Sequence, residues 1–319
     1  MSQSMKLCDF CAVIPFERII KRQSPDTAQD YDLGSGARIN GSQCPFCQLI
    51  LSAFYECHLD INSTRRISVE GHAKTKLFMI WELPRVRINF GRATVGLPLE
   101  TPRNRDIQFI EAFTESVLDT TRVSRWVSSC ESGHGSICRV QEHPTFTKAF
   151  QGLHVLRLID VETNCLVETQ KVEKYIALSY VWGAVSNFRL TKANRKALLV
   201  PGSLTDVWEG LPKTIQDAIV LVRHLGVRFL WVDALCLLQN DMHVLERGIR
   251  AMDLIYELAW LTVVAACGHD ANAHLPGIRH GTRRASKNTV EIKPGVHMGL
   301  VTGLDALLQD SVYSSRAWT

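Results

Sequence analysis

The sequence predicts an α/β fold in which a parallel β-sheet is flanked by helices. Three runs, YIALSYVWG (175–183), FLWVDALCL (229–237) and WLTVVAAC (260–267), are apolar continuously rather than alternately apart from Ser179, Asp233 and Thr262, as strands covered on both faces are. Two helical patterns, at 211–226 and 243–259, separate these runs. The order strand, helix, strand, helix, strand is typical of a parallel sheet with helical crossovers. We therefore expect the three strands to lie side by side and to run in one direction.

The two helical segments each have an apolar face. In the first, Pro212 suits the helix start and Gly226 its end, and the apolar stripe consists of Ile215, Ala218, Ile219, Val222 and Leu225. In the second, the corresponding face consists of Leu245, Ile249, Met252, Tyr256 and Ala259. Asp217 and Asp253 lie near polar stripes of these helices, so we expect surface acids or caps. We expect the connection 184–210 to be irregular.

Three regions follow one another along the chain. Residues 1–120 form an irregular, Cys-rich N-terminal region, residues 121–174 a lead-in helix and β-hairpin, and residues 175–319 the α/β domain. The hairpin is predicted from two β-rich runs around the polar sequence VETNC.

The N-terminal region mixes several patterns. Its segment 21–43 is rich in Gly, Ser and Asp and is predicted to be an irregular surface loop. The run CQLILSAFYECHL (47–59) follows as a short helix, and KLFMIWEL (76–83) and RVRINFGRATVGL (85–97) follow as strands.

Composition and charge exclude several classes of protein. Of the 319 residues, 46% are apolar and 21% are charged, which is the balance of a globular protein in water. The net charge of +4 is too small to predict nucleic-acid binding. The apolar runs are shorter than the roughly 20 residues of a membrane span, and the first residues lack an apolar signal core. We expect a cytosolic or nuclear protein, with the cytoplasm preferred and no membrane partner.

Ten cysteines in such a chain predict reduced thiols or metal ligands rather than disulfides. Cys8-x-x-Cys11 and Cys44-x-x-Cys47 form two matched pairs, and four thiolates can hold a tetrahedral structural zinc. The gap between the pairs exceeds the usual spacing of about 15–20 residues, so buried free thiols are the alternative. A bound zinc would anchor a small N-terminal module.

Asp233 places a carboxylate late in a strand that is otherwise apolar. In open parallel sheets the ligand crevice lies outside the carboxyl ends of the strands. Those ends are 179–183, 233–239 and 267–270. Asp233 therefore either reaches a cleft at this edge or accepts bonds from a neighbouring loop and ties the rim together.

Several motifs resemble, in order and spacing, the fungal heterokaryon incompatibility (HET) domain. They are YIALSYVWG, LPKTIQDAI, LGVRFLWVDALCLLQND, MDLIYELAWLTVVAA and HLPGI, and with the terminal SSRAWT the resemblance covers 175–319. The departures are mild: Ala234 and Leu237 stand where Ser and Ile are usual, Asn240 where Asp is common, and His274 where Gly often precedes Leu-Pro-Gly.

The end of the chain, SSRAWT, resembles the start of the family's final Arg-Gly-Trp-Thr-x-Gln-Glu motif. Because the sequence stops at Thr319, inside that motif, we expect a truncated or shortened chain. The resemblance implies a role in fungal non-self recognition and programmed cell death, with protein partners of an incompatibility system or further copies of the chain itself.

The HET family is in turn distantly similar to Toll/interleukin-receptor (TIR) domains, which implies a TIR-like or flavodoxin-like sheet. Some TIR domains assemble as signalling platforms and others hydrolyse NAD. Two hypotheses follow. The first is a non-catalytic interaction module. The second is a hydrolase that cleaves the ribosyl–nicotinamide bond of NAD.

In the NAD hypothesis, Asp233 stabilises an oxocarbenium-like transition state. Tyr180 and Trp182 would stack on the leaving base, and the remaining cleft residues would be Ser179, Gly183 and Gln239. Packing of both aromatic rings in the core or rim is the alternative. The glutamate that TIR enzymes use would fall beyond Thr319, so the interaction module is favoured. A further enzyme hypothesis is a Cys-His-Asp hydrolase with Cys236 or Cys267 and His269, but both cysteines lie in or beside apolar strands without an obvious activating base.

Overall fold

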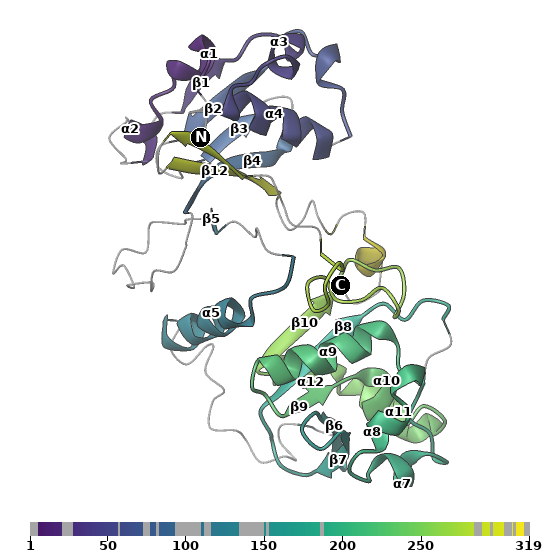
Figure 1. Cartoon of the computed structure of the whole chain (residues 1–319). Coiled ribbons are helices and arrows are strands. Elements are labelled where there is room, and N and C mark those ends of the chain that lie inside the picture. The colour runs from purple at the N-terminus through teal and green to yellow at the C-terminus, as the bar shows by residue number, and fades with distance from the viewer. Residues whose placement is uncertain are drawn as a thin grey trace. The chain divides into compact units, whose positions relative to one another are not determined.

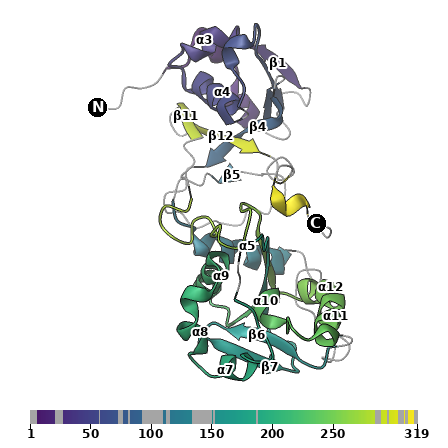
Figure 2. The ribbon, with the colours of Figure 1, turned by 90° about the vertical axis from the view of Figure 1, so that its right-hand side faces the viewer.

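The chain forms two compact units, shown as a computed structural model in Figures 1 and 2. The first unit comprises residues 1–115 and 285–309, and the second comprises residues 116–284 and 310–319. The second unit thus contains both the lead-in region and most of the predicted α/β region. The structure describes residues 6–20, 28–56, 58–72, 77–80, 83–92, 110–111, 116–133, 150, 153–185, 188–283, 289–293, 296–302, 308 and 311–315.

The second unit is built on a five-stranded sheet with the order β10-β8-β9-β6-β7. These strands are β6 (Leu156–Asp160), β7 (Cys165–Thr169), β8 (Tyr175–Tyr180), β9 (Phe229–Trp231) and β10 (Leu261–Ala265). Strand β8 pairs in parallel with both β10 and β9, which confirms the predicted arrangement of three strands. Strand β6 is antiparallel to both β9 and β7, so the predicted hairpin is confirmed as well.

Helices cover both faces of this sheet. Helix α9 (Lys213–His224) connects β8 to β9, and helices α11 (Met242–Arg250) and α12 (Met252–Glu257) connect β9 to β10. Because β8 lies between β9 and β10, the two connections run in opposite directions along the sheet. Right-handed crossovers then place them on opposite faces, and Figure 2 shows α9 on one side and α11 and α12 on the other.

The first predicted helix is confirmed as α9, which begins after Pro212. The second is interrupted at Ala251 and forms α11 and α12. The prediction of its apolar face was partly wrong, because Ile249 is 52% exposed whereas Gly248 and Ala251 are buried. At Gly248 an added Cβ would lie 2.5 Å from Leu237 Cδ2, so the helix approaches its neighbour through residues without bulky side chains. Glycine and alanine give no hydrophobic signal, which is why the sequence pattern misplaced the face.

Five shorter elements and one longer helix make up the rest of the second unit within the described residues. They are α5 (Thr120–Gly133), α7 (Arg195–Leu198), α8 (Ser203–Asp206), η3 (Trp208–Gly210), α10 (Asp233–Cys236) and η4 (Val312–Ser315). The connection expected to be irregular, 184–210, therefore holds two short α-helices and a 3-10 turn. Tyr175, Tyr180 and Trp231 are the largest fully buried side chains of this core.

The first unit contains a sheet with the order β1-β2-β3-β4-β12-β11, in which β5 pairs with β4. The strands are β1 (Gln29–Asp32), β2 (Ser68–His72), β3 (Leu77–Ile80), β4 (Leu83–Arg92), β5 (Ile110–Glu111), β11 (Thr289–Lys293) and β12 (Val296–Thr302). Strand β12 pairs antiparallel with β4 although about two hundred residues separate them in the chain. Local sequence patterns carry no information on such a pairing.

The helices of the first unit include α1 (Asp9–Ala12), α2 (Phe16–Ile20), α3 (Gly36–Asn40) and α4 (Pro45–Glu56). Helix α4 is the helix predicted after the polar loop. That loop, 21–43, was predicted to be irregular, and this was wrong for its second half, where β1 and α3 lie. Ser35 caps α3 by accepting a hydrogen bond from the backbone N–H of Arg38. None of the helices within the described ranges has the length and apolar content to cross a membrane.

Candidate functional site

The carboxyl ends of β8 and β9 bring Trp182 and Asp233 together. The indole Nε1 of Trp182 donates a hydrogen bond of 2.9 Å to Oδ2 of Asp233. Oδ1 of Asp233 accepts a second bond, of 2.7 Å, from the backbone N–H of Ala234. Asp233 is half-buried at the start of α10, and its carboxylate joins two adjacent strand ends. This is the geometry of a tie across the rim of the sheet.

Tyr180 and Trp182, the two residues predicted to stack on a leaving base, differ in solvent exposure. Tyr180 is only 2% exposed, and burial together with the nearby carboxylate of Asp233 raises the pKa of its hydroxyl well above the ordinary value. A ring this deep in the core offers no free face. Trp182 is half-buried, and the guanidinium of Arg189 lies 4.8 Å from its ring centroid as a cation–π contact.

The other three candidate cleft residues are also engaged by neighbouring groups. The Ser179 hydroxyl lies 2.9 Å from the hydroxyl of Tyr313. Nε2 of Gln239 donates to the backbone carbonyls of Asp233 and Leu237. Gly183 has a φ of +65°, and an added Cβ would lie 2.3 Å from Cβ of Asp270. Ser179 and Gln239 are therefore held by polar contacts, and the backbone of Gly183 packs closely against Asp270.

The geometry argues against Cys236 as a nucleophile. Its side chain is buried, and burial raises the pKa of the thiol to about 12. Nucleophilic catalysis by cysteine requires a thiolate. The final family motif, SSRAWT, lies only in part within the described residues, which include Ser314 and Ser315 but not 316–319.

Sequence reasoning missed a buried polar centre at Asp217. We expected a surface acid or cap, but Asp217 is 0% exposed. Its carboxylate accepts bonds from the backbone N–H of Leu275 (3.0 Å) and from Nε of Arg279 (2.6 Å), and Nδ1 of His274 lies 2.9 Å from it. These partners follow β10, far along the chain, so a helical pattern around Asp217 could not reveal them. Asp217 holds this loop against α9.

A cavity of about 90 Å³ lies between β6 and helices α10 to α12, and neither Trp182 nor Asp233 lines it. Trp231 lines it, and its buried Nε1 has no hydrogen-bond partner among the residues that the structure describes. Trp231 was expected to be a core strand residue, and its ring is fully buried. The cavity was not foreseen, because its walls come from five separate segments of the chain.

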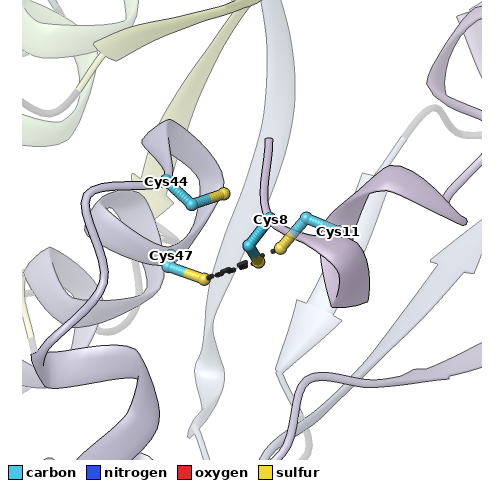
Figure 3. A group of neighbouring side chains, drawn as sticks. All are labelled: Cys8, Cys11, Cys44 and Cys47. Carbon is cyan, nitrogen blue, oxygen red and sulfur yellow. Dashed lines mark hydrogen bonds between the residues drawn. The ribbon is translucent and has the colours of Figure 1, made fainter. Parts of the chain in front are cut away.

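The first unit brings together the two Cys-x-x-Cys pairs. Figure 3 shows the four side chains turned toward one another, with Cys8 directly before α1 and Cys11 within it, and with Cys44 and Cys47 at the start of α4. All four sulfur atoms lie within 4.8 Å of one another, and three of the four residues are buried. The thiols are free, because the Sγ–Sγ distances of 3.6 and 3.7 Å far exceed the disulfide bond length of about 2.05 Å.

Sequence reasoning also missed Arg38, which lies in the segment predicted to be an irregular loop. Its Nη1 lies 3.5 Å from Sγ of Cys8, and its Nη2 lies 3.4 Å from Sγ of Cys47. Its Nε donates to the carbonyl of Leu33, and its guanidinium covers the ring of Phe10 at 4.3 Å. One cation is thus fixed beside two of the four sulfur atoms.

Comparison with known protein families agrees with the motifs identified from residue 175 onward. Residues 175–319 match the family model of the heterokaryon incompatibility protein (HET). The match begins with strand β8 and includes the strand ends around Trp182 and Asp233. Residues 175–319 of the chain therefore carry a heterokaryon incompatibility (HET) domain. Searches of curated proteins and of solved structures found no match.

Proposed function

We propose that this protein acts in fungal non-self recognition. In this proposal its HET domain is an interaction and assembly module in the cytoplasm that converts recognition of a partner protein into a programmed cell-death signal. The observation that carries the proposal is that polar groups at the strand ends form hydrogen bonds within the protein. The carboxylate of Asp233 is bonded to Trp182 and Ala234, and Gln239 is bonded to backbone carbonyls. Groups that hold the rim of a sheet together suit a rigid binding scaffold.

The edge of the sheet supports assembly with further copies. Strand β10 ends the sheet, and no other strand in the described part of the chain pairs with its outer edge. Four of its five residues are apolar, and Val264 is 46% exposed. Open edge strands expose unpaired backbone N–H and C=O groups, which can pair with a strand of another molecule. We therefore place the contact between copies at β10.

Cleavage of NAD is the second candidate function. It is favoured by one observation, the placement of an indole and a carboxylate 2.9 Å apart at the same sheet edge. A carboxylate there could stabilise the positive charge that develops on the ribose as nicotinamide leaves. However, the carboxylate already accepts two hydrogen bonds and Tyr180 is buried, so the assembly module has the stronger support.

Light scattering of the purified chain over a range of concentrations tests the assembly module. We expect oligomers that dissociate on dilution, and we expect Val264→Lys to shift them toward monomer because a charge on an edge strand opposes pairing. Val200→Lys is the matched control, because Val200 is 57% exposed but lies outside the sheet. A chain that is monomeric throughout, with no growth arrest when it is expressed in a fungal host, would refute the proposal.

Release of nicotinamide from NAD, followed by chromatography, separates the two functions. We expect no release from the purified chain. Release that is lost in Asp233→Asn but retained in Asp253→Asn would establish the hydrolase in place of the assembly module. Asp253 is a suitable control because it is an exposed acid on α12.

A further inference from the structure

We infer that Cys8, Cys11, Cys44 and Cys47 form a structural zinc centre in the first unit. This goes beyond the function proposed for the HET domain, because all four residues lie outside the segment that matches the family. The inference depends on the convergence of the sulfur atoms, on the turns that present them and on the cation beside them.

The spacing of the sulfur atoms fits a tetrahedral zinc ion. With Zn–S bonds of about 2.3 Å, the sulfur atoms at the corners of a tetrahedron lie about 3.8 Å apart. The distances from Cys47 to Cys8 and to Cys11 are 3.7 and 3.6 Å. Two packed thiols can come equally close, but four sulfur atoms within 4.8 Å of one another surround a common point. That arrangement is what a single four-coordinate cation requires.

Backbone turns hold each pair in a geometry suited to binding. The N–H of Cys11 and that of Ala12 both donate to the carbonyl of Cys8, at 3.0 and 2.8 Å. The N–H of Gln48 donates to the carbonyl of Cys44 at 2.9 Å. Each turn places the two cysteines of a pair on the same side. The ligand positions are therefore set by local hydrogen bonds, and the ion joins two turns that are already formed.

Arg38 supplies positive charge and N–H donors next to the sulfur atoms. Four thiolates around one divalent cation leave an excess of negative charge, which a nearby guanidinium offsets. Nη1 and Nη2 lie 3.5 and 3.4 Å from the sulfur atoms of Cys8 and Cys47, within reach of N–H···S bonds. Such groups outside the ligand shell typically change metal affinity about 10- to 100-fold. Cysteines that only fill a core do not need this cation.

The ion would join the N-terminal segment to helix α4. Helix α1 has only four residues and α2 has five, so neither is stable by itself. Cys11, Cys44 and Cys47 belong to the buried core of this unit, beside Phe16 and Phe46. A zinc ion at this point would fix residues 8–11 onto the first turn of α4, and its binding energy would add to the folding energy of the unit.

Metal analysis of the full chain tests the inference directly. The protein is purified under reducing conditions without chelators, and its metals are measured by mass spectrometry. We expect one equivalent of zinc per chain. Cobalt(II) added after removal of zinc should give the absorption bands of a tetrahedral tetrathiolate site. Less than half an equivalent of zinc together with no cobalt bands would overturn the inference, and so would stoichiometric iron or a disulfide among the four cysteines.

Two pairs of variants locate the site. Cys44→Ser should bind less than a tenth of the zinc bound by the wild type, whereas Cys130→Ser, at an exposed cysteine of α5, should keep the full equivalent. Arg38→Ala should still bind zinc but should release it to a competing chelator about 10-fold more readily. Arg66→Ala, at an exposed arginine of the same unit, should match the wild type. If Cys44→Ser does not fold, the cobalt titration of the wild type still shows whether a tetrathiolate site is present. Equal zinc content in both cysteine variants would overturn the inference.

Discussion

Nδ1 of His274 lies 2.9 Å from the carboxylate of Asp217, although 57 positions separate the two residues. His274 has a φ of +64°, a backbone conformation that favours glycine. Glycine is also the residue that often precedes Leu-Pro-Gly in HET domains. In this chain a histidine takes that position and contacts a fully buried acid, and the neighbouring Leu275 N–H and Arg279 contact the same acid. The loop after β10 is thus held to α9 at one carboxylate.

Asp217→Ala should destabilise the second unit by about 2–4 kcal/mol. Removal of one member of a buried ion pair typically costs about 3–5 kcal/mol, and the half-exposed partners His274 and Arg279 reduce that value. Asp253→Ala should change stability by about 0.5 kcal/mol or less, as expected for an exposed acid. Urea unfolding followed by tryptophan fluorescence measures both. Equal values would mean that the carboxylate at 217 contributes no more than a surface acid.

Two substitutions of His274 separate backbone strain from the contact with Asp217. His274→Gly removes the strain, worth about 1–3 kcal/mol, together with a hydrogen bond worth about 1–3 kcal/mol, so the net change should be small. His274→Ala loses the contact and keeps the strain, and it should therefore be less stable than His274→Gly by about 1 kcal/mol or more. The same unfolding measurement applies. An alanine variant as stable as the glycine variant would show that φ at this position carries no cost.

The parallel strands could be predicted from the sequence because each strand is marked by a pattern of neighbouring residues. Each of β8, β9 and β10 is a short apolar run with a helix before or after it, and this alternation predicts neighbouring parallel strands. It does not predict that β8 lies between β9 and β10. The proximity of Trp182 and Asp233 could be anticipated from the same alternation, since both follow the ends of neighbouring strands. The four cysteines were found from their spacing alone.

Contacts between distant segments could not be predicted in the same way. Arg38 lies in a polar segment, and nothing in its local sequence indicates that Cys8 and Cys47 lie beside it. Asp217 looked like a surface acid because its partners are about sixty residues away. Strand β12 completes the first unit from the other end of the chain, which a division of the sequence into consecutive regions does not foresee.

Acid should destabilise the second unit through Glu168. Burial opposes its ionisation, but hydrogen bonds from Arg195 and Arg157 outweigh burial and hold its pKa below the ordinary value of 4.5. Because the folded-state pKa is depressed, this contribution to stability is fully present above pH 4.5 and is lost as the pH falls below that value toward the folded-state pKa.

Unfolding free energies measured at a series of pH values test this effect. Glu168→Gln should be less stable than the wild type at neutral pH and should lose less stability on acidification. Glu209→Gln should follow the wild-type curve, because Glu209 is largely exposed and its ion pair is long. A wild-type slope that is retained in Glu168→Gln would assign the acid sensitivity to other carboxylates.

Gly183 was expected to line a ligand cleft, but its contacts within the protein already require glycine. Gly183 and Gly226 both have positive φ, of +65° and +68°. An added Cβ at Gly183 would lie 2.3 Å from Cβ and 2.9 Å from Cα of Asp270, whereas one at Gly226 would meet nothing within 4 Å. The two alanine variants therefore share the strain, about 1–2 kcal/mol, and differ in the clash, about 1–3 kcal/mol.

Gly183→Ala should thus be less stable than Gly226→Ala by about 1–3 kcal/mol, as measured by urea unfolding. Because Asp270 Cα is backbone, the segment after β10 has to move before a methyl group fits, and the carbonyl of His269 lies only 3.2 Å from the same point. Equal losses of stability in the two variants would mean that the segment after β10 can move away from the added methyl group without an energetic cost. The close approach of Asp270 would then no longer explain the glycine, and a ligand that needs the space above Gly183 would become the better explanation.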